Sequence, residues 1–389
     1  MAGAIRQPID ISALERYIDA NVPDIKTPLN VKQFGYGQSN PTYLLTSSST
    51  STRYVLRKKP PGTLLSKTAH NVAREYRILT ALGPTSVSVP KTYCLCEDDA
   101  VIGTAFYIME FLDGRIIEDP SLPDVSPEDR TAMWKSAVET LAKFHRVDPA
   151  SVGMAGFAKQ GGFYARQLKT FRSISEAQAK AVDVESGEAV GKIPHYDDMV
   201  AFFAEQRTQP KDRSGFVHGD YKIDNVVFHK TEPRVIGILE VADVDRGIHS
   251  WEMSTLGHPL SDLSNLLTPF TTASSPIAQE IGRGSTDFLP NRTPGLPTQE
   301  QCIGWYSKLA GWEPTPVEIT WGEAFGLYRG SIIMQGIAAR YALRQASSEK
   351  AKDYAAQMAP FAEIAWGLVQ SCKRQIEEHK KDEPERSKL

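Results

Sequence analysis

The stretch HGDYKIDN, residues 218–225, has residue types and spacing that suit phosphoryl transfer. That chemistry needs a carboxylate to accept the proton of the attacking hydroxyl, and ligands that hold Mg2+ on the phosphates. Asp220 is followed five residues later by Asn225, on a loop between the apolar runs SGFVHG and VIGIL. We therefore predict that Asp220 is the base and Asn225 a metal ligand. The alternative is a capped turn in which the Asp220 side chain accepts hydrogen bonds from backbone amides.

Two kinds of segment must position this loop. Up to about residue 113, β-rich runs such as TYLLT and RYVLRK surround turn residues and one helical stretch, TAHNVAREYRILTAL. Long helical patterns follow from about residue 120, although TTASSPIAQEIGRGSTDFLPNRTPGLP predicts a long loop. We expect an α+β protein with a small antiparallel-sheet lobe (1–113), a large helical lobe (114–372) and a charged tail (373–389).

Composition excludes some partners. The net charge is −3, which does not favour nucleic acid or an anionic membrane surface. No apolar run approaches the roughly 20 residues that span a bilayer, so no membrane span is expected. The sequence ends in Ser387-Lys388-Leu389 on a polar tail. A terminal SKL is read by the peroxisomal import receptor, so this ending predicts a peroxisomal protein.

The motifs taken together resemble one family. FGYGQSNPTYLLT, YVLRKKPPG, EYRIL, FYIMEFLDGR, VHGDYKIDNVVFH, TEPRVIGIL and WEMSTLGHPLSDLSNLL occur in order across roughly residues 30–345. This pattern resembles the aminoglycoside phosphotransferase and choline kinase group, and most of all the kinase-type domain fused to some acyl-CoA dehydrogenases. The resemblance implies a bilobal protein-kinase-like fold that uses ATP and Mg2+.

The resemblance also implies roles for residues of the sheet lobe. The loop FGYGQSN, with Gly37 and Ser39, would cover the nucleotide phosphates. Arg57 would contact phosphate from the third strand, with Glu75 as its helix partner. Strand alternation sends the neighbouring Lys58 to the other face. The alternative for Arg57 and Glu75 is a surface ion pair, which would contribute little to stability.

The stretch YIMEFLDG resembles the hinge of this family. Met109 would border the adenine, and the backbones of Glu110 and Leu112 would hydrogen-bond to it. In the helical lobe, a structural role is favoured for His145, and the resemblance makes Asp262 a support for the catalytic loop.

The sequence departs from the family where a second metal ligand is expected. The family has an Asp at the end of the VIGIL strand, followed by Trp-Glu, whereas this chain has Glu240 and reaches Trp251-Glu252 only after the run 241–250. Glu240 could bind the metal, or Asp243 or Asp245 could replace it. The third hypothesis is that the run is a gene-prediction product, such as a translated intron, which impairs this form.

The leading functional hypothesis is a phosphotransferase acting on a small-molecule hydroxyl. The resemblance suggests a hydroxy acid or hydroxyacyl-CoA as acceptor, and Arg166, Lys169 and Arg172 could meet an anionic acceptor unless they form a solvated helix face. Antibiotic phosphorylation is less favoured, because no acidic acceptor site is evident. The alternative class is a pseudokinase that binds nucleotide or acyl-CoA without catalysis.

Overall fold

The computed structural model describes residues 2–34, 40–60, 71–239, 254–280, 284–346 and 350–382. The chain forms two compact units that are interleaved in sequence. The first unit, the sheet unit, comprises Met1–Asp119, Val147–Phe157 and His218–Thr255. The second, the helical unit, comprises Pro120–Arg146, Ala158–Val217 and Leu256–Leu389. The loop that contains Asp220 therefore belongs to the same unit as the sheet.

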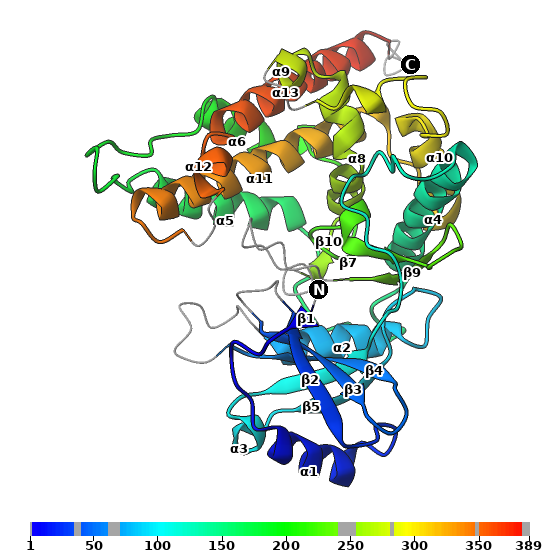
Figure 1. Cartoon of the computed structure of the whole chain (residues 1–389). Coiled ribbons are helices and arrows are strands. Elements are labelled where there is room, and N and C mark those ends of the chain that lie inside the picture. Colours follow the sequence, from blue (N-terminus) through cyan, green and yellow to red (C-terminus); the bar gives the residue numbers. More distant parts are fainter. Residues whose placement is uncertain are drawn as a thin grey trace. The chain divides into compact units, whose positions relative to one another are not determined.

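The sheet unit is built on an antiparallel sheet with the strand order β1-β2-β3-β4-β6-β5 (Figure 1). Its strands are β1 (Ala2–Gly3), β2 (Leu29–Phe34), β3 (Thr42–Ser47), β4 (Arg53–Lys58), β5 (Thr92–Cys96) and β6 (Phe106–Glu110). Its helices are α1 (Ile11–Asn21), α2 (Val72–Leu82) and α3 (Asp99–Ile102). Helix α2 begins at Asn71, whose side chain accepts from Arg74 N, and packs against β5 and β6.

Because side chains alternate along each strand, the two faces of this sheet have different surroundings. One face carries Leu56 and Ile108 into a hydrophobic cluster with α1 and α3. Lys58 lies on this face too, with Nζ 5.9 Å from the centroid of the Tyr43 ring, as alternation predicts. The next residues along the strands, Arg57 and Tyr107, point toward α2 and contact Glu75. One face thus forms a core, and the other presents polar groups to α2.

A short antiparallel hairpin completes the sheet unit. It consists of β8 (Val226–Phe228) and β9 (Val235–Ile238), and the helical turn η2 (Ile223–Asn225) precedes it. Arg115 forms a bridge with Phe228, which joins the hairpin to the segment that follows β6. A Cβ added at Gly237 would overlap Leu112 Cδ1, so a larger residue there would force the Leu112 side chain to shift. The hairpin is therefore packed directly against the predicted hinge.

The helical unit is dominated by long helices around an aromatic core. The core draws on α5, α6, α11 and α13 and includes the stacked rings of Trp321 and Phe325, whose centroids are 5.2 Å apart. The helices are α4 (Pro127–Arg146), α5 (Phe163–Gln178), α6 (Tyr196–Ala204), α8 (Leu260–Ser274), α9 (Pro276–Glu280), α10 (Gln299–Ala310), α11 (Pro316–Ala342), α12 (Ala351–Ala355) and α13 (Met358–Asp382). The shorter elements are η1 (Gln206–Thr208), η3 (Thr286–Phe288), β7 (Gly215–Val217) and β10 (Thr255–Gly257), and β7 pairs with β10.

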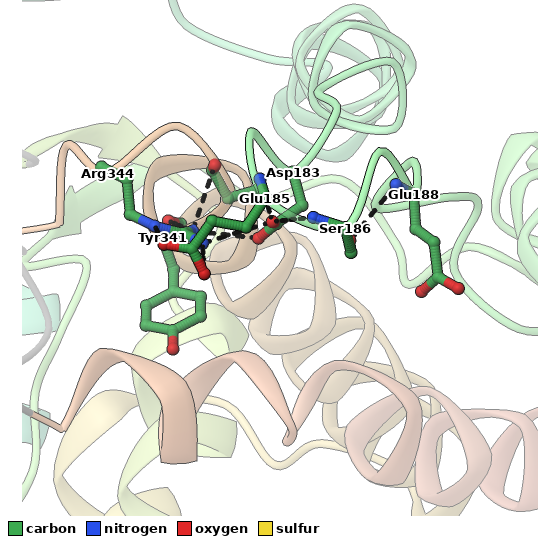
Figure 2. Close-up of polar contacts among 7 residues, drawn as sticks. Asp183, Glu185, Ser186, Glu188, Tyr341 and Arg344 are labelled. Carbon is green, nitrogen blue, oxygen red and sulfur yellow. Dashed lines mark hydrogen bonds and ion pairs between the residues drawn. The ribbon is translucent and has the colours of Figure 1, made fainter.

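Ion pairs join the connection between α5 and α6 to Arg344, which lies just after the end of α11 (Figure 2). Arg344 Nη1 lies 2.9 Å from Asp183 Oδ2, and Arg344 Nη2 lies 2.7 Å from Glu185 Oε2. Arg344 also donates to the Tyr341 carbonyl, one of the last carbonyls of α11. These contacts hold the pKa of Asp183 well below its usual range. We call this arrangement the Arg344 cluster.

The observed elements confirm the predicted α+β class. The prediction of a long loop for residues 271–297 was wrong in part, because α8 extends to Ser274 and both α9 and η3 follow it. Three of the Ser and Thr residues, Thr271, Thr272 and Ser274, belong to α8, and their hydroxyls donate to carbonyls one turn earlier. Across the described residues, no helix has the length and apolarity needed to cross a membrane. The predicted import signal, Ser387-Lys388-Leu389, lies outside the described residues.

Candidate active site

The structure brings the predicted base and the predicted metal ligand into direct contact. Asn225 Nδ2 donates to the main-chain carbonyl of Asp220 at 2.7 Å and to Asp220 Oδ2 at 2.8 Å. The amide nitrogen therefore faces Asp220, which directs the amide oxygen away from it. Gly219 precedes Asp220 with φ 94°, a conformation that favours glycine. The sequence His218-Gly219-Asp220 thus forms a turn that fixes the carboxylate beside Asn225.

Lys222 also belongs to this loop, although no sequence pattern predicts a role for it. Its Nζ lies 3.7 Å from Asp220 Oδ2 and 3.0 Å from Asp224 Oδ2, and its side chain is 19% exposed. A cation beside the carboxylate is available to an anionic substrate. Its only signal in the sequence is its place two residues after Asp220, within the spacer between Asp220 and Asn225.

A second polar group gathers around Glu75 on α2. Arg57 Nε lies 3.3 Å from Glu75 Oε2, Asn40 Nδ2 donates to Oε1 at 2.8 Å, and the Tyr107 hydroxyl donates to Oε2 at 3.0 Å. The side chains of Arg57 and Glu75 are 3% and 0% exposed, so this is no surface ion pair. Both carboxylate oxygens are bonded, which offsets the desolvation of a buried charge. The sequence places Asn40 only at the end of the predicted phosphate loop, and no sequence pattern marks Tyr107.

The predicted hinge has main-chain groups that suit a purine edge. Glu110 N–H donates to the Lys91 carbonyl at 2.7 Å, and the Leu112 carbonyl accepts from Gly114 N–H at 3.1 Å. A base bound there would therefore use the Glu110 carbonyl and the Leu112 N–H. One acceptor and one donor, two residues apart, complement the amino group and ring nitrogen of adenine. Met109 beside them is 8% exposed.

Several predicted site residues lie outside the described residues. They are Gly37 and Ser39 of the phosphate loop, and the candidate metal ligands Glu240, Asp243 and Asp245. In the part of the chain that the structure describes, no group of three or more His, Cys, Asp or Glu side chains could hold a metal ion. The described oxygen donors of Asp220 and Asn225 are nonetheless of the hard type that Mg2+ prefers.

In the helical unit, His145 lies in a buried network. His145 Nδ1 is 2.7 Å from the Tyr306 hydroxyl, and Nε2 is 3.2 Å from Asp262 Oδ2. His145 and Asp262 are 8% and 0% exposed, and their partners come from α4, α8 and α10. A histidine bonded through both ring nitrogens between helices fits the structural role predicted for it.

The basic residues predicted to meet an anionic acceptor line one stretch of α5. Arg172 Nε lies 3.7 Å from Glu176 Oε1, and Arg166 Nη2 donates to the Lys159 carbonyl at 3.0 Å. Lys169 and Arg172 are exposed. Their role in acceptor binding stays a prediction.

The sequence of this chain is similar to known proteins over most of its length. The model of the phosphotransferase enzyme family matches residues 30–295. A protein of Arabidopsis thaliana named probable acyl-CoA dehydrogenase is 37% identical over 371 residues, which are 92% of this chain and 43% of that protein. The chain thus spans less than half the length of this relative.

Solved structures show the same fold. A proposed aminoglycoside phosphotransferase from Ralstonia eutropha is 33% identical, covers 94% of this chain and 99% of its own, and has a TM-score of 0.77. Choline kinase from Cryptosporidium parvum, at 12% identity and a TM-score of 0.52, covers 95% of this chain and 96% of its own. The fold and the family match together define a kinase-like phosphotransferase architecture. The chain belongs to the phosphotransferase enzyme family.

Proposed function

We propose that the protein transfers the γ-phosphoryl group of ATP, in the presence of Mg2+, to a hydroxyl of a small molecule. The observation that carries this proposal is the contact between Asn225 Nδ2 and Asp220 Oδ2 at 2.8 Å, within the same compact unit as the buried Arg57–Glu75 pair. The first supplies a base beside a metal ligand, and the second a fixed cation on the nucleotide-binding sheet.

In the proposed reaction, Asp220 accepts the proton of the acceptor hydroxyl while its oxygen attacks the γ-phosphorus. The bond between the γ-phosphorus and the bridging oxygen breaks, and ADP leaves. Mg2+ would neutralise charge on the phosphates, held by Asn225 and a carboxylate from Glu240, Asp243 or Asp245. Leu239 N–H donates to the Asn225 carbonyl at 2.9 Å, and this contact supports a ligand role for Glu240, the next residue.

For the acceptor, we propose a hydroxy acid or its CoA ester. Support comes from the relative named as an acyl-CoA dehydrogenase, of which this chain matches 43%. A phosphorylated hydroxyl is a better leaving group than a free one, so phosphorylation would prepare a hydroxyacyl compound for later elimination.

The test is a panel of hydroxy acids and their CoA esters, incubated with ATP and Mg2+ and analysed for phosphorylated product. We expect Asp220→Asn to lower turnover by about 10²- to 10⁴-fold, as for loss of a general base. Asp197→Asn, an exposed site on α6, is the matched control and should keep wild-type turnover. Equal turnover by Asp220→Asn would refute the assignment of the base. ATP binding without Mg2+ dependence and without any product would favour the non-catalytic alternative.

A further inference from the structure

Arg74 joins three separate stretches of the sheet unit. It lies on α2, immediately before Glu75. Its Nε and Nη2 donate to the Ser254 carbonyl at 3.3 and 3.0 Å, and its Nη1 donates to the Phe157 carbonyl at 3.3 Å. Its guanidinium carbon lies 3.8 Å from the centroid of the Phe157 ring. The side chain is therefore fixed from two directions.

Ser254 continues this chain of contacts to the catalytic loop. Ser254 is 1% exposed, and its hydroxyl donates to the His218 carbonyl at 3.3 Å. His218 is fully buried and lies two residues before Asp220, whose N–H lies 3.4 Å from His218 Nδ1. A continuous path of hydrogen bonds thus leads from α2 to the main chain that holds the candidate base.

The chemistry of these contacts favours positioning over charge neutralisation. Arg74 is half-buried, and burial lowers its pKa. Among the described residues it makes no ion pair, and its donors go to two main-chain carbonyls. A guanidinium presents its N–H groups in a rigid fork, so two bonds to one carbonyl and a third to another fix the relative position of both segments. Lysine would keep the charge and lose that fork.

We propose that Arg74 is a positioning residue for phosphoryl transfer, which ties the helix that carries Glu75 to Ser254 and, through the Ser254 hydroxyl, to the catalytic loop. The proposal rests on the proposed function. Adjacent residues of one helix would then hold both halves of the site, because Glu75 orients Arg57 and Arg74 orients the loop of Asp220. A displacement of the base by about 1 Å is enough to lower the rate of such a reaction substantially.

The decisive variant is Arg74→Lys, compared with Arg77→Lys at an exposed position of the same helix. We expect Arg74→Lys to lower kcat by about 10- to 10²-fold, as for a misplaced catalytic group. The KM for ATP and the melting temperature should stay near wild type, and Arg77→Lys should change none of the three. Ser254→Ala, which keeps the carbonyl and removes the hydroxyl, should lower kcat in the same direction by less. Wild-type kcat in Arg74→Lys, or a loss explained by a lower melting temperature, would overturn the proposal.

Hydrogen–deuterium exchange separates this proposal from the proposed function, because it needs no turnover. In Arg74→Lys, amides of residues 216–225 should exchange faster than in wild type, while those of β2 and β3 should not change. Unchanged exchange in residues 216–225 would overturn the positioning role even in an active enzyme. Faster exchange in a chain that phosphorylates no acceptor would refute only the proposed function.

Discussion

Two glutamates among the described residues are buried, and only one of them lies beside a cation. Glu75, in the sheet unit, is fully buried and lies 3.3 Å from the guanidinium of Arg57. Glu323, in the helical unit, is 8% exposed and bonds to the neutral side chains of Gln299 and Thr271. Burial without a cation raises the pKa of Glu323 from its ordinary 4.5 to about 7.

The difference indicates which buried carboxyl is built to carry charge. A carboxylate with a guanidinium, an amide and a phenol around it is suited to hold the arginine side chain in place. A carboxyl bonded only to neutral groups is more stable in its protonated form, and its contribution to the fold depends on pH. The sheet unit thus contains a buried ion pair, and the helical unit contains a buried carboxyl that titrates.

Of the substitutions considered, Glu75→Ala should have the largest effect. This change leaves Arg57 buried without its carboxylate, so we expect a loss of about 3–5 kcal/mol in the free energy of unfolding. Nucleotide binding should also be lost, because Arg57 is no longer oriented. Urea denaturation and nucleotide titration measure the two effects.

A double variant separates charge from packing at the same place. Arg57→Met with Glu75→Leu removes both charges and keeps side chains of similar size, so much of the lost stability should return. Nucleotide binding should not return with it. If binding survives in the double variant, Arg57 has no part in the nucleotide site.

The raised pKa of Glu323 predicts that the free energy of unfolding depends on pH. Its folded pKa of about 7 exceeds the unfolded value near 4.5, so the folded state binds more protons between these values. The stability it contributes is therefore present below about pH 4.5 and is lost as the pH rises to about 7. The loss should be on the order of 3 kcal/mol, at 1.36 kcal/mol per pKa unit.

The variant Glu323→Gln isolates this contribution. The amide can still accept from Gln299 and cannot ionise, so the stability difference between variant and wild type should grow from pH 4.5 to pH 7 in favour of the variant. Glu300→Gln, at an exposed position of α10, is the control. A difference that does not vary with pH would contradict the assignment.

Lys222 is partly exposed and lies beside Asp220, so we expect its substitution to affect turnover more than stability. We expect Lys222→Met to lower kcat by about 10²-fold, the scale for losing one electrostatic contact in an active site. The melting temperature should change little. Lys230→Met, which removes an exposed cation paired with Asp113, is the control for surface charge.

Substitution of Arg344 should have the smallest effect on stability, because the ion pairs of the Arg344 cluster are partly exposed (Figure 2). We expect Arg344→Ala to shift the melting temperature by about 2 °C or less, with the shift reduced further at high salt. Arg344 has φ 57°, a conformation that favours glycine. Arg344→Gly should therefore be more stable than Arg344→Ala, although both lose the same ion pairs.

Much of this architecture could be predicted because it depends on local patterns. The spacing of Asp220 and Asn225 and the alternation that separates Arg57 from Lys58 are visible in the sequence and agree with the contacts observed. Residues that act across the fold were not predictable in this way. Arg74 meets Ser254, which lies 180 positions away, and Asn40 meets Glu75. Helical spacing alone could not show that Arg74 faces a main-chain carbonyl.

The interleaving of the two units has a consequence for how the protein is made. The sheet unit needs β8 and β9, yet these leave the ribosome only after much of the helical unit has been synthesised. The strands made earlier can therefore contact this hairpin only after it has been synthesised. Gly237 then packs against Leu112, and Phe228 forms its bridge with Arg115. A fragment that stops after β6 would lack these contacts. Biochemical work on the sheet unit should therefore use a chain that extends at least to Thr255.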